Sequence, residues 1–379
     1  MKKVNQKVRA PSPGTRVFAP EFAAKDCRRV FTSRKSNKPD GAPDQQEVNK
    51  LPPFGSAWSL VPTKGEAPEQ CSGQSINYIP SKRSIYCAYG QDVNENYSSQ
   101  FWQFSLDTNE WKRLVVKGVT PRAGCGSTFH DTKIWFFGGL SGPNMAIQDF
   151  HYIDLDTLEV VKPETTGPLP PPCANPLMAY YNNFIIIWAS TGAPTPSSLY
   201  TYNIDQAEWK KIDTEYIFRS GACGTLIGSI YYIFGLSVPR TVLSLDLRDF
   251  SMKVVPTTGI EPPVALENLS TVALGSTFFA FETIGSGSKT RLFIFDCERA
   301  NWLCYSVILS EEARETDAPR IVFYIEDERK LVAVWESPDV NSQPMTELSV
   351  GESMSRINQH LDFMNMIEEG TSQNDKLKS

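Results

Sequence analysis

The sequence has few of the residues on which catalysis and metal binding most often depend. Only three of its 379 residues are histidine, His130, His151 and His360, and no two have the spacing of paired metal ligands. The chain also lacks a phosphate-binding glycine loop, a Gly-x-Ser-x-Gly nucleophile motif, a His-Glu-x-x-His motif and a kinase signature. We therefore predict that the protein is not an enzyme, and we assign it no catalytic residue, no metal ligand and no cofactor.

Long apolar runs are absent as well. The most apolar stretch, Phe184–Trp188, is far shorter than the roughly 20 residues that a membrane-spanning helix needs. The basic N-terminus is not followed by an apolar segment, so we expect neither a secretory signal nor a membrane anchor. No Cys-x-x-Cys pair occurs among the eight cysteines. We expect a cytoplasmic protein whose thiols stay reduced.

Positive charge is concentrated in the first part of the chain. The whole sequence carries a net charge of −6, whereas residues 1–40 hold 11 basic and three acidic residues, a balance of +8. The remainder is therefore acidic, at −14. We interpret residues 1–50 as a basic extended arm that an acidic surface would attract. The acidic body makes nucleic acid an improbable partner.

A repeat of about 50 residues occupies the rest of the chain. It is marked by Trp58, Trp111, Trp209 and Trp302, and Val160 and Met252 take the two intervening positions. Each unit reads as four strands: a small-residue strand, an aromatic strand that often ends in glycine, a strand ending in Asp or Asn, and a strand that begins near the Trp. Helical periodicity is absent throughout this region.

One unit shows the pattern most completely. It reads Thr-Pro-Arg-Ala-Gly-Cys-Gly-Ser from Thr120, Trp-Phe-Phe-Gly-Gly from Trp135 and Tyr-Ile-Asp-Leu from Tyr152. This pattern resembles the Kelch repeat, although the double glycine is complete only here. The resemblance covers residues 56–350 and implies an all-β fold, a Kelch-type β-propeller of four-stranded blades. The residues that mark the repeat are Trp58, Gly90, Trp111, Gly138, Gly139, Trp209, Gly235 and Trp302.

The repeat count predicts a six-bladed propeller over residues 56–351. The sixth unit has three strands but no outer strand on its C-terminal side. Residues 57–61 near the N-terminus have the Trp-strand pattern and no blade of their own. We expect them to close the last blade, since closure leaves no blade with an open edge.

The C-terminal part differs from the repeats. Met354, Ile357, Leu361, Met364 and Ile367 recur at helical spacing, so we predict an amphipathic helix over 352–370 and a disordered tail over 371–379. The apolar face would either pack on the propeller itself or offer a methionine-rich stripe to a partner protein.

Four cysteines recur at the same place in successive units: Cys71, Cys125, Cys173 and Cys223. Four thiolates around one axis would bind a soft metal. Alternatively, the position accepts only a small side chain, and cysteine packs well as a small apolar residue. The sequence leaves both interpretations open.

The resemblance implies a protein-interaction platform that uses loops on the faces of the propeller. Our first hypothesis is a non-catalytic intracellular scaffold that binds one or more partner proteins through these loops, with the arm and the helix as extra contacts. The alternatives are an enzyme or metal-dependent protein on the same ring, and a structural role in a large assembly such as a cytoskeletal filament. The sequence does not name the partner or the binding face.

Overall fold

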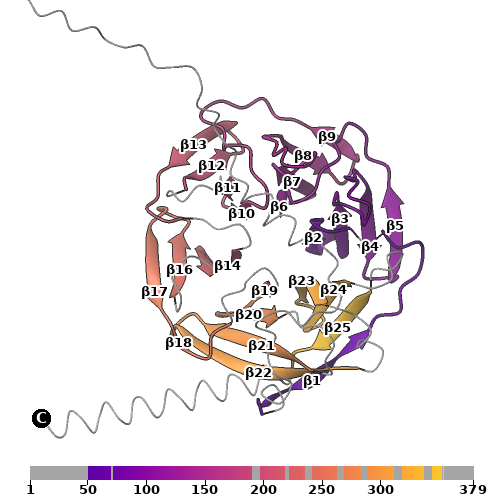
Figure 1. Cartoon of the computed structure of the whole chain (residues 1–379), viewed down its shortest axis with the longest axis vertical. Coiled ribbons are helices and arrows are strands. Elements are labelled where there is room, and N and C mark those ends of the chain that lie inside the picture. The colour runs from indigo at the N-terminus through magenta and orange to yellow at the C-terminus, as the bar shows by residue number, and fades with distance from the viewer. Residues whose placement is uncertain are drawn as a thin grey trace, which may run out of the picture.

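The described residues form a ring of β-sheets around a central axis (Figure 1). The computed structural model describes residues 50–69, 71–189, 197–217, 222–234, 241–262, 269–282, 289–310, 318–336, 344–351 and 353. The ring has six four-stranded blades, which confirms the predicted all-β, six-bladed propeller. The predicted arm except Lys50, the predicted helix except Ser353, the tail 371–379 and Gly235 lie outside the described residues.

Blades 1 to 4 are separate antiparallel sheets whose strands follow one another from the axis to the rim (Figure 1). Blade 1 contains β2 (Ser75–Ile79), β3 (Ser84–Ala88), β4 (Phe101–Ser105) and β5 (Glu110–Leu114), with the 3-10 turn η1 (Pro80–Lys82) after β2. Blade 2 contains β6 (Gly126–His130), β7 (Lys133–Phe137), β8 (Phe150–Asp154) and β9 (Glu159–Val161). Blade 3 contains β10 (Leu177–Tyr181), β11 (Phe184–Trp188), β12 (Leu199–Asn203) and β13 (Glu208–Ile212). Blade 4 contains β14 (Cys223–Ile227), β15 (Ile230–Phe234), β16 (Thr241–Asp246) and β17 (Met252–Pro256).

Blades 5 and 6 are joined into one nine-stranded sheet. Blade 5 contains β19 (Leu269–Leu274), β20 (Thr277–Glu282), β21 (Lys289–Asp296) and β22 (Asn301–Leu309), and the short β18 (Thr258–Gly259) pairs with β22. Blade 6 contains β23 (Ala318–Ile325), β24 (Lys330–Glu336), β25 (Met345–Ser349) and the N-terminal strand β1 (Pro53–Leu60).

The strand β1 closes the ring, as the sequence predicts. It pairs antiparallel with β25, where Ser59 lies opposite Glu347 and Leu60 opposite Thr346. A second pairing was not expected: β1 also lies parallel to β22, with Trp58 opposite Leu309. Because β1 stands between the outer strand of blade 5 and the third strand of blade 6, it fastens both blades at once.

The hydrophobic core lies between neighbouring blades. Trp209 of β13 is fully buried and meets Phe150 of blade 2 edge-on, with the ring centroids 4.9 Å apart. Trp302 of β22 makes a similar edge-on contact with Phe234 of blade 4, at 5.6 Å. Each buried aromatic side chain of this kind contributes about 2 to 3 kcal/mol, so the interfaces between blades hold much of the folding free energy.

The polar end of the third strand has a local structural reason in blades 2, 3 and 5. The Asp154 side chain accepts a hydrogen bond from the backbone N–H of Asp156 at 2.9 Å. Asn203 accepts one from Gln206 at 3.0 Å, and Asp296 accepts one from Glu298 at 2.9 Å. These bonds give backbone N–H groups of the turn before the outer strand an acceptor. A short Asp or Asn side chain can reach the backbone two or three residues further along the chain.

Three glycines lie against the outer-strand tryptophans, a feature that the repeat analysis did not predict. The segment entering a blade pairs with the start of that blade's outer strand, as in the bridge between Thr166 and Glu208. A Cβ at Gly167 would lie 2.2 Å from the carbonyl oxygen of Trp209. Equivalent contacts of 2.4 Å and 2.1 Å join the pairs Gly65 with Trp111 and Gly259 with Trp302.

We predict that Gly167→Ala destabilises the protein much more than Gly118→Ala. Both glycines have a positive φ, +85° and +84°, but a Cβ at Gly118 would meet no atom within 4 Å. Gly118→Ala should cost about 1 to 2 kcal/mol from the left-handed backbone alone. Gly167→Ala adds the clash with Trp209, and urea unfolding should place its midpoint clearly lower. Equal midpoints for the two variants would contradict this account.

Candidate functional site

The propeller has two faces with different connections. We call the turn face the one formed by the short turns within blades, such as 80–83, 106–109, 131–132 and 326–329. We call the loop face the one formed by the second-to-third-strand loops, such as 89–100 and 138–149, and by the segments between blades, such as 115–125 and 162–176.

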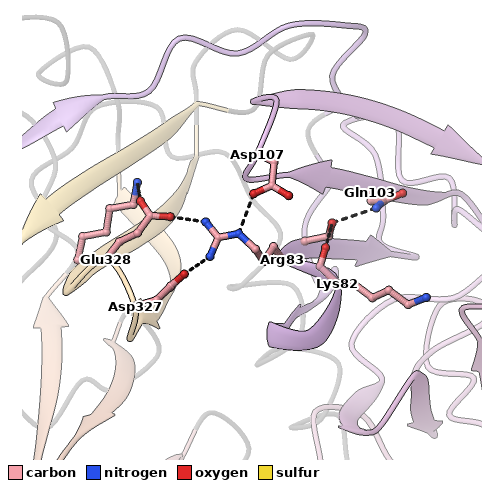
Figure 2. A network of polar contacts seen from close by, with 8 residues as sticks. Lys82, Arg83, Gln103, Asp107, Asp327 and Glu328 are labelled. Atoms are coloured by element: carbon pink, nitrogen blue, oxygen red, sulfur yellow. Dashed lines mark hydrogen bonds and ion pairs between the residues drawn. The ribbon is translucent and has the colours of Figure 1, made fainter.

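On the turn face, Arg83 joins the first blade to the last (Figure 2). Its Nε lies 2.7 Å from Asp107 of the same blade. Its two terminal nitrogens contact Asp327 and Glu328, which belong to the turn between β23 and β24 of blade 6, the latter at 2.5 Å. The neighbouring Lys82 pairs with Asp156 of blade 2 at 2.5 Å. The turn at 80–83 therefore holds blade 1 to both of its neighbours.

The Arg83 network is open to solvent. The Arg83 side chain is 33% exposed, and those of Asp107 and Asp327 are about 60% exposed. Lys330 and Arg83 together hold the pKa of Glu328 below its usual range. Since exposed ion pairs are weakened by salt, the network strengthens the closure of the ring only in part.

On the loop face, a buried ion pair connects the segment between blades 1 and 2 with the loop of blade 2. The Arg122 side chain is fully buried, and its Nη2 lies 2.5 Å from Asp149. Arg122 also donates to the carbonyl oxygens of Thr120 at 3.1 Å and Gly138 at 3.3 Å. Lys162 pairs with the second oxygen of Asp149 at 2.8 Å. The carboxylate of Asp149 thus holds two cations from two different segments.

A tyrosine and a histidine extend this pair across the interface between the blades. The hydroxyl oxygen of Tyr89, which follows β3, lies 2.6 Å from Nε2 of His151 in β8. Nδ1 of the same ring lies 3.1 Å from Asp149, although its N–H does not point straight at the oxygen. The guanidinium of Arg122 lies 5.2 Å from the centre of the Tyr89 ring. We call Tyr89, Arg122, Asp149 and His151 the interblade network.

The charges of the interblade network follow from burial and from these contacts. Burial alone would raise the pKa of Asp149, but contacts with His151, Lys162 and Arg122 bring it far below its usual range. Burial lowers the pKa of His151 below 6.5, and the Asp149 carboxylate opposes this shift only in part. Burial also raises the pKa of Tyr89, so its hydroxyl stays protonated. The network at neutral pH therefore contains a neutral His151 beside an ionised Asp149.

The loops of blades 1 and 2 begin and end on the interblade network. The backbone N–H of Gly90 donates to the carbonyl oxygen of Arg122 at 2.8 Å, and the N–H of Arg122 donates to Ser98 at 3.1 Å. The N–H of Gly138 donates to the carbonyl oxygen of Asp149 at 3.1 Å. Both ends of each loop are thus held by buried groups.

The outer parts of the same loops carry apolar side chains that solvent reaches. Val93 in the loop of blade 1 is 61% exposed, and Met145 in the loop of blade 2 is 60% exposed. Leu169 is exposed in the segment between blades 2 and 3. The side-chain amide of Gln148 donates a hydrogen bond to the carbonyl oxygen of Pro170 in the same segment, at 2.6 Å. Exposed apolar side chains on firmly held loops are typical of surfaces that bind proteins.

The recurring cysteines are packed in separate cores. Cys125 and Cys173 belong to different hydrophobic clusters, and Cys223 packs against a third. Burial raises the pKa of Cys125 to about 11 and those of Cys173 and Cys223 to about 12, so these thiols stay protonated. Within the described residues no group of three or more His, Cys, Asp or Glu side chains could hold a metal. The structure favours the small-residue interpretation over the metal site.

The glycines of the repeat lie directly against the recurring cysteines. A Cβ added to Gly90 would lie 2.5 Å from the Cβ of Cys71. The same addition to Gly139 would lie 3.1 Å from the Cβ of Cys125, and at Gly138 it would meet the carbonyl oxygen of Cys173. The glycine positions therefore have no room for a side chain next to the cysteines.

The structure places the residues chosen from the sequence in two groups. Trp58, Trp111, Trp209 and Trp302 lie in outer strands and are buried. Gly90, Gly138 and Gly139 lie where the second strands end and the loop face begins. His130 stacks on Tyr180 with the ring centroids 4.2 Å apart, in the interface between blades 2 and 3.

The sequence analysis missed the interblade network. It noted that His151 has no partner at metal-ligand spacing but did not connect it with Tyr89 or Asp149, which are 62 and two residues away. The available signal was an arginine, Arg122, among small residues, followed 27 residues later by an aspartate next to an aromatic strand.

We predict that Arg83→Gln lowers the thermal stability of the protein in a salt-dependent way. The substitution removes the contacts that span the seam between blades 1 and 6, and 1 M NaCl already screens these contacts. The midpoint difference from the wild type, measured by circular dichroism, should shrink between 20 mM and 1 M NaCl. Arg248→Gln is the control, because Arg248 pairs with Asp246 inside one turn and should have little effect.

We predict that Arg122→Met costs about 3 kcal/mol of unfolding free energy, because it removes one partner of a buried ion pair. The same substitution at the exposed Arg248 should change stability little. Denaturant unfolding of both variants checks this. If Arg122→Met were as stable as Arg248→Met, the buried pair would not be a structural element of the loop face.

The propeller has clear relatives. Residues 36–235, just over half of the chain, match the family model described as the KLHDC2/KLHL20/DRC7 Kelch-repeats domain. The chain is 23% identical to "Acyl-CoA-binding domain-containing protein 4" of Arabidopsis thaliana over 45% of its own length and 25% of that protein. It is 28% identical to "Rab9 effector protein with kelch motifs" of Bos taurus over 32% of its length and 34% of that protein.

A further similarity is to "Dynein regulatory complex subunit 7" of Chlamydomonas reinhardtii, with 22% identity over 31% of this chain and 10% of that protein. The chain thus spans at most about a third of the length of these relatives. The matched residues include the blade with the double glycine and the tryptophans Trp58, Trp111 and Trp209. Together with the six four-stranded blades, the match shows that the chain belongs to the Kelch-repeat family.

Proposed function

We propose that the chain is a non-catalytic scaffold that binds a protein partner on the loop face of blades 1 and 2. Kelch-repeat propellers are in general protein-interaction domains. The observation that carries the proposal for this chain is the pairing of exposed apolar tips with buried loop ends. Val93 and Met145 face solvent, while Gly90 and Gly138 are bonded to the interblade network. Such a surface binds without a large loss of loop entropy.

The charges of the two loops define the partner further. The segments 89–100 and 138–149 contain no basic residue, and they contain Asp92, Glu95 and Asp149. Asp92 and Glu95 lie within two residues of Val93. The complementary partner is a polypeptide segment with an apolar side chain flanked by lysine or arginine. Binding of this kind is faster at low salt, because the charges steer the encounter.

The printed names of two relatives suggest a setting for the partner. One relative is a Rab9 effector and another is a subunit of a dynein regulatory complex. We extend this to a cytoplasmic role in which the propeller binds a partner protein within a large or cytoskeleton-associated assembly. The basic arm 1–50 and the segment 352–370 would make additional contacts. No helix among the described residues is long and apolar enough to cross a membrane.

We predict that Val93→Asp and Met145→Asp each abolish capture of the partner. Tagged wild-type chain and each variant would be incubated with extract of the source cells at low salt, and the retained proteins identified by mass spectrometry. Val254→Asp is the matched control, because Val254 is an exposed apolar residue of β17 on the rim, away from the loop face. A partner kept by Val254→Asp and lost from both loop variants supports the proposal.

The same experiment separates the loop face from the ends of the chain. A chain without 1–50 and 352–379 should keep the partner if the loops bind it. Loss of the partner from this shortened chain, with retention by both loop variants, would move the binding site to the ends. Turnover of a small molecule by the purified chain without any protein partner would contradict the scaffold.

A further inference from the structure

We propose that the interblade network positions the loops of blades 1 and 2 and that uptake of a proton by His151 releases them. The consequence for partner binding rests on the proposed function, but the release itself does not. The inference assigns a regulatory role to Tyr89, Arg122 and His151, which are buried, and to Asp149, which is partly buried.

The geometry makes His151 the centre of the network. Its ring is 1% exposed and stacks on Phe136 of β7, with the centroids 5.3 Å apart. Nε2 faces the hydroxyl of Tyr89 from blade 1, and Nδ1 faces the carboxylate of Asp149. With one proton on the ring, Nδ1 carries it toward Asp149 and Nε2 accepts the hydrogen bond that Tyr89 donates. Both ring nitrogens then have a complementary neighbour.

A second proton disturbs this arrangement on two sides. It would enter at Nε2, so that Nε2 and the Tyr89 hydroxyl both present a hydrogen to each other. Tyr89 would have to turn its hydrogen away, and within the described part of the chain its hydroxyl makes no other hydrogen bond. A buried donor that loses its acceptor costs about 1 to 3 kcal/mol.

Burial and two nearby cations also oppose the second proton. Arg122 approaches from the segment before β6 and Lys162 from the end of β9, and both are cations. Asp149, which precedes β8, is the carboxylate that faces all three groups, and it favours the proton. Tyr89 and Cys125 are the remaining titratable neighbours, and both stay neutral because burial raises the pKa of each. Burial is the main cause that lowers the pKa of His151 from 6.5, and Asp149 opposes this shift only in part.

The sign of the pH effect follows from this lowered pKa. Below pH 6.5 an open form with hydrated His151 binds a proton that the closed form does not bind. The open form therefore gains on the closed form as the pH falls, until the pKa of the closed form is reached, and the closed form is favoured above pH 6.5. Each pH unit in this window changes the opening equilibrium by about a factor of ten.

Opening at His151 reaches the loops through short backbone contacts. Tyr89 is followed directly by Gly90, whose N–H is bonded to Arg122. Asp149 accepts through its own carbonyl oxygen from Gly138, and Gly139 accepts from Ile147 at 2.9 Å. When the contact between Tyr89 and His151 breaks, both loop ends lose their common anchor. The loops that hold Val93 and Met145 are thereby released together.

Hydrogen exchange at different pH values tests the release without a partner. Exchange rates of peptides covering 89–100 and 138–149 would be divided by their intrinsic rates at each pH between 5 and 8. Protection should be constant from pH 8 to about 6.5 and then fall by up to about tenfold per pH unit. A peptide covering 203–212 in blade 3, whose bonds include Trp209 to Thr166, should show no such fall.

Two histidine variants separate the proton effect from a general loss of structure. His151→Gln keeps an oxygen that accepts from Tyr89 but does not titrate, so protection of both loops should become independent of pH. His130→Gln is the matched control and should behave as the wild type, since His130 stacks on Tyr180 in another interface. Tyr89→Phe should lower protection of both loops already at pH 7.5, because Nε2 loses its donor.

The wild-type chain supplies a readout that does not depend on variants folding. Its three histidines give few imidazole signals in nuclear magnetic resonance, and one should titrate below pH 6.5 together with loop opening. Titration of His151 at or above pH 6.5 without a change in loop protection would overturn the proposal. So would pH-dependent protection that persists in His151→Gln. Loss of the partner in the loop variants bears only on the proposed function.

Discussion

The structure depends on the closure of the ring, since each blade buries its apolar side chains against two neighbours. Closure here is made by β1, which bonds to β25 of blade 6 and to β22 of blade 5. Trp58 of β1 is fully buried in the core between these two blades. On the turn face Arg83 joins the same part of the ring to blade 1. Without these contacts the ring would be open at blade 6, and the blade interfaces on either side of it would be lost.

Blade 2 differs from its neighbours in how it is stabilised. Its outer strand β9 has three residues, has Val160 where blades 1, 3 and 5 have tryptophan, and is entered by Gly118 without close contact. It is also the blade with the double glycine and with most of the interblade network. Polar contacts of Arg122, Asp149 and His151 are thus added to the aromatic packing of this blade. Buried polar groups are specific in geometry but sensitive to charge, which suits a place where a surface is to be adjusted.

The sequence predicted the features that repeat and missed those that occur once. The six blades, the closing strand and the role of the polar strand ends follow from residue types that recur at similar intervals, such as the four tryptophans. The contact of Tyr89 with His151 joins residues 62 positions apart in two blades, and no periodicity reports it. The pairing of β1 with β22 was not predicted either, because it depends on how the outer edges of blades 5 and 6 lie next to each other in space. Within the described residues the close approach of Gly167 to Trp209 repeats at Gly65 with Trp111 and at Gly259 with Trp302, yet the spacing of glycines and tryptophans alone did not reveal it.

The double pairing of β1 has a consequence during synthesis of the chain. Residues 53–60 leave the ribosome before any blade exists, yet their partners are residues 306–309 and 346–347. The strand must therefore remain unpaired until β22 emerges, about 250 residues later, and it gains its second partner only with β25. Its exposed edge and Trp58 are a mark of an unfinished chain, which chaperones and proteases recognise in nascent proteins. A product that ended before β22 would therefore keep the edge of β1 and Trp58 uncovered.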